Sequence, residues 1–306
     1  MKSFIITVDT EGDNLWYYRK GDPITTRNTK YIPRFQELCE KYGFKPVYLT
    51  NYEMLCDDEY VKYVRVKEQL GLCEVGLHLH AWNNPPLYEL DAKYNGNPYL
   101  IEYPDDIMKA KFDYLYNLFC EKIGHAPTSH RAGRWAMNER YFKLLEEYDI
   151  KVDCSVTPHI NWSHVVGETI GGTDYTNAQE VAHMIGNVME VPLTVIPSRR
   201  LLSNSFRRNI KTILKGSMLQ LRPATCSLRE MKYVVDRCKK NTPIDYLEFM
   251  LHSSELMPGG SPYFKSEEAI SQMYRDIEAL FKYIKNNNFN GVTLQEYYEA
   301  WQISQA

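Results

Sequence analysis

The sequence predicts an α/β protein in which buried parallel strands alternate with helices. Apolar, β-branched runs typical of strands covered on both faces recur at 3–9, 46–50, 73–79, 151–156, 188–195 and 246–251. Stretches with helical periodicity lie between them, at about 30–42, 58–70, 104–122, 138–148 and 265–286. Strand followed by helix, repeated, requires helical crossovers and therefore a parallel sheet. Polar side chains gather where these strands end, which favours a closed or nearly closed barrel with its site at that face.

Local signals support the individual elements. The run 3–9 (SFIITVD) is almost continuously apolar before it reaches an acidic turn. The helix at 104–122 opens with Pro104, Asp105 and Asp106, the residue types that favour a helix N-terminus. The chain of 306 residues, with 44% hydrophobic and 25% charged residues, has a globular composition that excludes collagen-like, disordered and disulfide-scaffold classes. We expect one barrel domain over 1–306.

The expected compartment is the cytoplasm. The N-terminus has no apolar run long enough for a signal peptide, and no segment approaches the ~20 apolar residues of a membrane span. The seven cysteines are scattered and contain no C-x-x-C pair, which indicates reduced, mostly buried thiols.

Residues 199–240 form a strongly basic segment, predicted to be a helical insertion in the barrel. It holds 12 Lys and Arg against Glu230 and Asp236, a net charge of +10 in a chain whose net charge is −3. Phe206, Ile210, Ile213 and Leu214 would share one face of an amphipathic helix. A solvated insertion packed on the barrel explains this pattern. Contact with an anionic lipid carrier, or with the inner face of a membrane as a peripheral protein, is the functional alternative; nucleic-acid binding is not expected because no basic motif interleaved with aromatic residues occurs.

Two pairs of polar residues at strand ends are candidate ligands. Asp9 and Glu11 follow the first strand at i and i+2, so both project to one side. His78 and His80 repeat this spacing at the end of the third strand. Two imidazoles and a carboxylate suit a zinc-like ion. An acidic turn and two structural histidines are the alternative explanation.

Further candidates follow later strands. Arg131 could hold a carboxylate ionised through a bidentate pair. His252 ends a strongly apolar strand and is a candidate acid. Asn83 is a further candidate contact, with Trp82 as a wall beside it.

Five motifs in order resemble the polysaccharide deacetylase family, also called carbohydrate esterase family 4 or the NodB-homology fold. They are TVDTEGD at 7–13, EVGLH at 74–78, HRAGRW at 130–135, DCSVTP at 153–158 and LHSSEL at 251–256. The match is to a cytoplasmic branch with a VDxE first motif and spans about 3–300, apart from the basic insertion.

The resemblance implies a distorted (β/α) barrel of about seven strands that binds a divalent metal and removes an N-acetyl, O-acetyl or N-formyl group from a sugar. Asp9 then matches the catalytic base, His78 the first metal histidine, Arg131 the arginine that pairs with the base, and His252 the acid.

Two departures from the family pattern fall in the ligand positions. Thr10 stands where the family has a second Asp, so Glu11 must reach the metal instead. Trp82 stands where the family has its second histidine, so His80 must replace it. The fourth motif normally carries an aromatic pair, for which Trp162 is the candidate here.

The resulting hypothesis is a zinc-dependent deacetylase acting on an acylated sugar, a polysaccharide precursor or a carrier-linked amino sugar. Glu11, His78 and His80 hold the metal, and Asp9, Arg131 and His252 carry out the proton chemistry. The expected substrate-binding residues are Trp82, Asn83, Arg134, Trp135 and Trp162. Two alternatives stay open: hydrolysis of a non-sugar small amide such as a ureide, and a non-catalytic glycan-binding relic of the fold.

Overall fold

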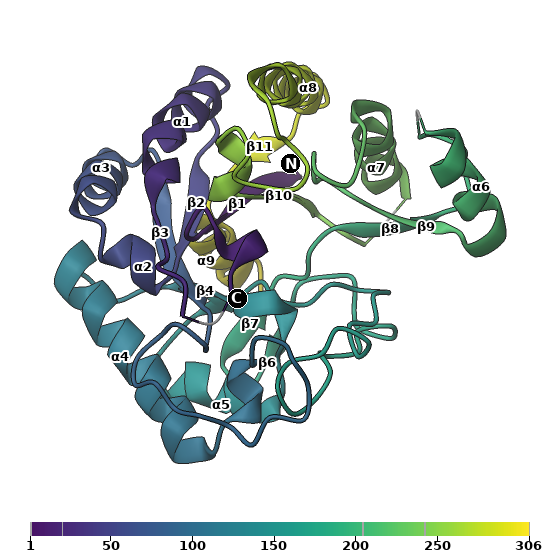
Figure 1. The fold of residues 1–306 in the computed structure, drawn as a ribbon. Helices are drawn as coiled ribbons and strands as arrows, with labels where there is room; N and C mark the ends of the chain where they lie inside the picture. The colour runs from purple at the N-terminus through teal and green to yellow at the C-terminus, as the bar shows by residue number, and fades with distance from the viewer. Residues whose placement is uncertain (1, 20, 204, 242, 306) are drawn as a thin grey trace. The chain divides into compact units, whose positions relative to one another are not determined.

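The structure is a computed structural model that describes residues 2–19, 21–203, 205–241 and 243–305 (Figure 1). Its main sheet contains β1 (Ser3–Thr10), β2 (Pro46–Thr50), β3 (Glu74–Leu79), β4 (Ser129–Ala132), β5 (Val152–Asp153), β6 (His183–Ile185), β7 (Val188–Glu190), β10 (Tyr246–His252) and β11 (Asn290–Gly291). The hydrogen-bonded order is β10-β1-β2-β3-β4-β5-β7-β6, with β11 beside β1. Each register described in this sheet is parallel except that of β6 with β7. The predicted class, a mostly parallel α/β sheet of the distorted (β/α) barrel type, is confirmed.

The helices follow the strands as the alternating pattern predicts. They are α1 (Ile32–Lys41), α2 (Tyr52–Leu55), α3 (Asp58–Gln69), α4 (Asp105–Ile123), α5 (Glu139–Glu147), α6 (Phe206–Lys215), α7 (Leu228–Asn241), α8 (Glu267–Asn286) and α9 (Leu294–Gln305). Among the described residues, no helix combines the length and apolar character needed to cross a lipid bilayer.

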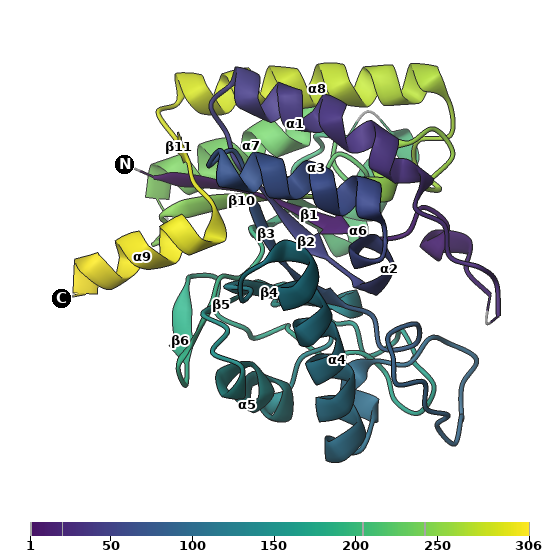
Figure 2. The same cartoon turned by 90° about the vertical axis from the view of Figure 1, so that its left-hand side faces the viewer.

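The chain divides into two compact units. The first unit combines Met1–Val47 with Leu193–Thr293, and the second combines Tyr48–Pro192 with Leu294–Ala306. In the first unit, α7 packs against α8 and β10, as the side view in Figure 2 lets the reader follow. In the second unit, α4 packs on β3 and α5 on β7.

An aromatic cluster fills the core of the first unit. The ring of Phe4 in β1 lies 4.8 Å from that of Phe44 and 5.8 Å from that of Phe281 in α8, and Phe249 in β10 lies 5.7 Å from Phe281. These edge-on contacts join the sheet to α8 and fix β1 beside β10. The start of β1 is therefore packed into the core of the first unit, and the acidic pair follows at its opposite end.

Residues 199–240 are only partly a separate excursion from the sheet. A second, two-stranded sheet pairs β8 (Val195–Ser198) with β9 (Ser217–Gln220), and α6 lies in the connection between these strands. By contrast, α7 buries Met231, Val234 and Val235. It is therefore a helix of the first unit's core that covers β10.

Two predicted strands are shorter than the sequence indicated. The run 151–156 forms a strand only at Val152–Asp153. Cys154 N still donates to His130 O, but the following donors bond to side chains: Ser155 N to Asp153 Oδ2 and Val156 N to Glu190 Oε1. The run 188–195 is divided into β7 and β8 around Pro192, which has no N–H for a sheet ladder.

Candidate metal and active site

The acidic pair and His252 lie together in the first unit. β1 and β10 are parallel with Asp9 opposite His252, and this register brings the end of each strand to the same place. The Nε2 atom of His252 lies 3.7 Å from Asp9 Oδ2 and 3.8 Å from Glu11 Oε1. Asp9 and Glu11 are 3% and 4% exposed. Two carboxylates this well buried need nearby positive charge or donors, and His252 is one such group.

Polar side chains hold the backbone of Glu11 in place. Ser253 Oγ accepts from Glu11 N at 3.1 Å and donates to Glu11 O at 3.1 Å. Asn28 Nδ2 donates to Glu11 O and to Ser253 Oγ, each at 2.8 Å. All of these contacts are buried, so Glu11 continues from β1 in a fixed position rather than in a mobile turn.

Arg222 determines which nitrogen of His252 carries the proton. Its Nη2 atom lies 3.0 Å from His252 Nδ1. A guanidinium can only donate, so Nδ1 accepts and the neutral ring carries its hydrogen on Nε2, the atom that faces Asp9 and Glu11. The same Nη2 atom also donates to Glu255 Oε1 at 3.2 Å, and Glu255 Oε2 accepts from His252 N at 3.3 Å.

Glu255 is a buried carboxylate that Arg222 keeps ionised. Burial alone raises the pKa of this carboxyl, but the charge of the Arg222 guanidinium, together with the bond from the backbone N–H of His252, holds the pKa below its usual range. Trp16 completes the surroundings of His252, with ring centroids 4.9 Å apart and its Nε1 donating to Ser254 Oγ. His252 is thus fixed on several sides.

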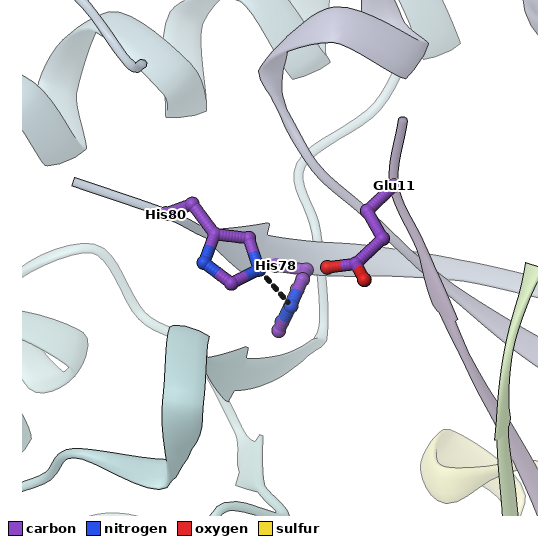
Figure 3. Close-up of side chains that lie close together, drawn as sticks. All are labelled: Glu11, His78 and His80. Atoms are coloured by element: carbon purple, nitrogen blue, oxygen red, sulfur yellow. Dashed lines mark hydrogen bonds between the residues drawn. The ribbon is translucent and has the colours of Figure 1, made fainter. Parts of the chain in front are cut away.

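His78 and His80 lie together at the end of β3 in the second unit. His78 Nδ1 lies 2.9 Å from the carbonyl oxygen of Arg131, its partner on β4. A carbonyl can only accept, so Nδ1 carries the hydrogen and Nε2 keeps its lone pair. That Nε2 lies 3.0 Å from His80 Nε2 (Figure 3). The ring of His80 packs against Trp82 at 4.2 Å.

The residues present fit a divalent metal. His78 and His80 offer two imidazole nitrogens at one strand end of the second unit, and Glu11 offers a buried carboxylate in the first unit. Two imidazoles and a carboxylate are a donor set that catalytic zinc uses. The bond from His78 Nδ1 to a carbonyl is the outer contact that commonly orients a metal-binding histidine.

Gly133, directly after β4, allows the chain to pass close to His80. A Cβ atom at this position would lie 2.5 Å from Leu79 O and 2.7 Å from His80 Nδ1. The next two residues, Arg134 and Trp135, have positive φ angles of 56° and 63°. Non-glycine residues in this conformation carry backbone strain, which commonly occurs near functional sites.

Arg131 is completely buried beside a polar network of β4 and β5. Its Nε donates to Cys154 O at 3.0 Å and its guanidinium lies 4.9 Å from the ring centre of Trp135. Beside it, Asp153 Oδ1 accepts from His130 Nδ1 at 2.7 Å, and His130 Nε2 lies 2.8 Å from the Tyr141 hydroxyl. Burial lowers the pKa of His130 despite the neighbouring Asp153, so this imidazole is neutral.

The predicted substrate-binding residues occupy different environments. Asn83 Nδ2 donates to Glu53 Oε2 at 2.6 Å, and Trp162 Nε1 donates to Thr157 Oγ1 at 2.8 Å. Arg134 donates to the carbonyl oxygens of Asn97 and Val166 and lies over the ring of Tyr99. Arg134 therefore joins loops of the second unit through its donors. Trp82 and Trp135 pack beside His80 and Arg131, and a role for any of the five in binding substrate stays a prediction.

The comparisons with known proteins find similarity in structure only. No family model and no curated protein matches this sequence. A Mycobacterium smegmatis protein named among the polysaccharide deacetylases matches with a TM-score of 0.52 and 13% identity, over 99% of this chain and 92% of that one. The chain has the polysaccharide deacetylase fold. A match to PuuE allantoinase has a TM-score of 0.52 and 9% identity, over 98% of this chain and 89% of that one.

A third structure widens the range of chemistry found on this fold. A 4-α-glucanotransferase from Thermococcus litoralis matches with a TM-score of 0.53 and 11% identity, over 98% of this chain but only 38% of that one. The polysaccharide deacetylase fold therefore fixes the scaffold of this protein, while its activity must be argued from the residues of the site.

Sequence reasoning missed several residues that organise the site. Glu255 lies inside the LHSSEL motif and Arg222 inside the basic segment, so both were visible but had no assigned partner. Asn28 and Ser253 gave no signal, because a single amide or hydroxyl is common in any turn. Only the register of β1 with β10 makes Ser253 a neighbour of Glu11.

Proposed function

We propose that this protein is a metal-dependent hydrolase that removes an acetyl or other small acyl group from the nitrogen of an amino sugar. The observation that carries the proposal is the pair His78 and His80, whose Nε2 atoms lie 3.0 Å apart and which supplies, with Glu11, the donor set of a catalytic zinc site. The fold of the polysaccharide deacetylases supports the same reaction class. An acylated sugar or a carrier-linked precursor is the proposed substrate.

The roles follow from the chemistry of each side chain. Glu11, His78 and His80 hold the ion, which we propose to be zinc and which supplies Lewis-acid polarisation and a more acidic bound water. Asp9 is the general base, and Arg131 is proposed to keep it ionised. His252 carries a proton on Nε2, the nitrogen that faces Asp9, and is the proposed acid for the departing amine.

The test measures metal content and reaction products on the purified chain. We expect zinc by elemental analysis, and release of acetate or formate from a panel of N-acylated amino sugars that stops when a chelator is added. Asp9→Asn should retain zinc and lose at least about 100-fold in kcat/KM, the contribution of a general base. His80→Ala should lose the metal, whereas His183→Ala, in the half-buried edge strand β6, should keep both metal and activity.

Other outcomes would identify the alternatives. A chain without metal whose sugar binding is unaffected by chelation would be a non-catalytic relic of the fold. Cleavage of a ureide in the panel, without acyl release from any sugar, would make the protein a hydrolase of small amides. A wild-type rate for Asp9→Asn would refute the role of Asp9 as base.

A further inference from the structure

The apolar side of α6 faces away from the protein. Phe206 is 79% exposed, Leu214 73% and Ile213 58%. Ile210 on the same face is also exposed, and Leu201 and Met218 beside the helix add to the surface. These six residues, here called the α6 patch, are a large share of the exposed bulky apolar side chains found among the described residues.

The polar side of α6 attaches the helix to the first unit. Arg208 forms an ion pair with Glu230 in α7 at 3.2 Å and donates to the carbonyl oxygen of Thr225. Asn209 Nδ2 donates to Ser203 O at 2.9 Å, and Thr212 is 4% exposed. A surface helix normally buries its apolar side and presents its polar side to water. In α6 this arrangement is reversed, so packing on the protein does not explain its apolar residues.

Basic side chains surround the α6 patch. Arg199, Arg200, Arg207 and Lys215 are all exposed. Residues 199–240 together carry a net charge of +10. Apolar side chains flanked by Arg and Lys are the features by which a helix lies in the interface of a membrane that contains anionic lipids.

We propose that the α6 patch docks this protein on an anionic lipid surface. The apolar side chains would enter the boundary between head groups and acyl chains, while the surrounding Arg and Lys contact lipid phosphates. The charge decides against a symmetric dimer in which two α6 patches face each other, because two segments of net charge +10 repel. The proposal does not depend on the chemistry of the candidate active site.

Vesicle flotation with the full chain tests the proposal. Wild-type protein should float with vesicles of phosphatidylcholine and phosphatidylglycerol and stay behind with phosphatidylcholine alone. Phe206→Ser combined with Leu214→Ser should weaken binding at least about tenfold, since both side chains would leave the apolar phase. Added salt should also weaken wild-type binding, because it screens the charges.

Matched variants separate this surface from exposed residues in general. Ile303→Ser removes a side chain that is 78% exposed on α9 and should bind vesicles like the wild type. The α6 variant should keep wild-type acyl release on a soluble substrate, and Asp9→Asn should keep wild-type vesicle binding. Failure of the proposed hydrolase function would therefore leave the lipid-docking proposal intact, and failure of lipid docking would leave the hydrolase function intact.

Three results would overturn the proposal. The first is that wild-type protein binds neither kind of vesicle, and the second is equal binding to neutral and anionic vesicles. The third is a wild-type dimer, measured by sedimentation, that becomes monomeric in the Phe206→Ser, Leu214→Ser variant while no vesicle binding is seen. That result would assign the α6 patch to a second copy of the chain.

Discussion

His78 and His252 are held in opposite tautomers, and each suits a different role. The carbonyl of Arg131 accepts from His78 Nδ1, which leaves the lone pair of Nε2 for a metal. Arg222 donates to His252 Nδ1, which leaves a hydrogen on Nε2 for transfer. In each ring, the partner of Nδ1 thus decides whether Nε2 has a lone pair for a metal or a hydrogen to give.

Arg222→Met should make stability depend on pH in a way that wild type does not. Arg222 is 12% exposed and Glu255 is fully buried, so the variant leaves a buried carboxylate without its cation, at a cost of about 3–5 kcal/mol near pH 7. In wild type the pKa of Glu255 is lowered, so its contribution to stability is present above the ordinary carboxyl pKa and is lost only as pH falls through the lowered value. In the variant, burial raises this pKa, so protonation relieves the buried charge at mildly acid pH.

Urea unfolding at several pH values measures this difference. The free energy of unfolding of Arg222→Met should fall furthest below that of wild type at neutral pH, and the difference should become smaller toward acid pH. Adding Glu255→Gln should recover part of the stability, because neither member of the pair is then left charged and alone. Arg237→Met, at an exposed position on α7, should unfold like wild type. A deficit that is the same at every pH would show that Arg222 acts through packing and not through the charge of Glu255.

At the scale of the elements, β4 and β5 are joined mainly by hydrogen bonds of their side chains, because the backbone hydrogen bonds between these two strands are few. Ser155 Oγ accepts from Ala132 N at 2.8 Å and donates to Asp153 Oδ1 at 2.8 Å. Asp153 in turn holds His130. This network fixes the backbone on either side of Arg131. The orientation of the guanidinium therefore depends on polar side chains of both β4 and β5.

Tyr141→Phe should destabilise the second unit by about 1–3 kcal/mol. His130 Nδ1 donates to Asp153, so Nε2 must accept from the Tyr141 hydroxyl, and the variant leaves this buried nitrogen without a donor. Tyr148→Phe is the matched control: its hydroxyl donates to Asp113 at 3.1 Å near the surface, and its loss should change stability by no more than about 0.5 kcal/mol. Denaturant unfolding compares the two, and equal effects would refute a special role for the His130 contact.

Sequence periodicity predicted the elements whose backbone bonds are the regular ones of a sheet or a helix. The first run, 3–9, became β1 at Ser3–Thr10, and 104–122 became α4 at Asp105–Ile123. Periodicity failed where side chains replace the backbone hydrogen bonds between strands, as after Asp153. A hydrophobic pattern does not reveal a carboxylate that accepts a hydrogen bond from the backbone. The short strand β6 was missed for a related reason, since three half-buried residues carry little pattern.

The candidate site was predictable where two functional residues share one strand. The i, i+2 spacing placed Asp9 with Glu11 and His78 with His80 from sequence alone. Arg222 could not be assigned in this way, because a bridge between Leu221 and Phe249 brings it to β10 from a different part of the chain. Contacts of this kind depend on the fold and have no local signal.

At the scale of the whole molecule, metal binding should appear as stability. A ligand that binds only the folded chain stabilises the folded state by about 2.7 kcal/mol when the free ligand concentration is 100 times its dissociation constant. Thermal unfolding should therefore move to higher temperature as zinc is added and return when a chelator removes it. Glu11→Gln and His80→Ala should each reduce this shift, since each removes one proposed ligand. His183→Ala should show the full shift, and a zinc response unchanged in both ligand variants would place the ion elsewhere in the protein.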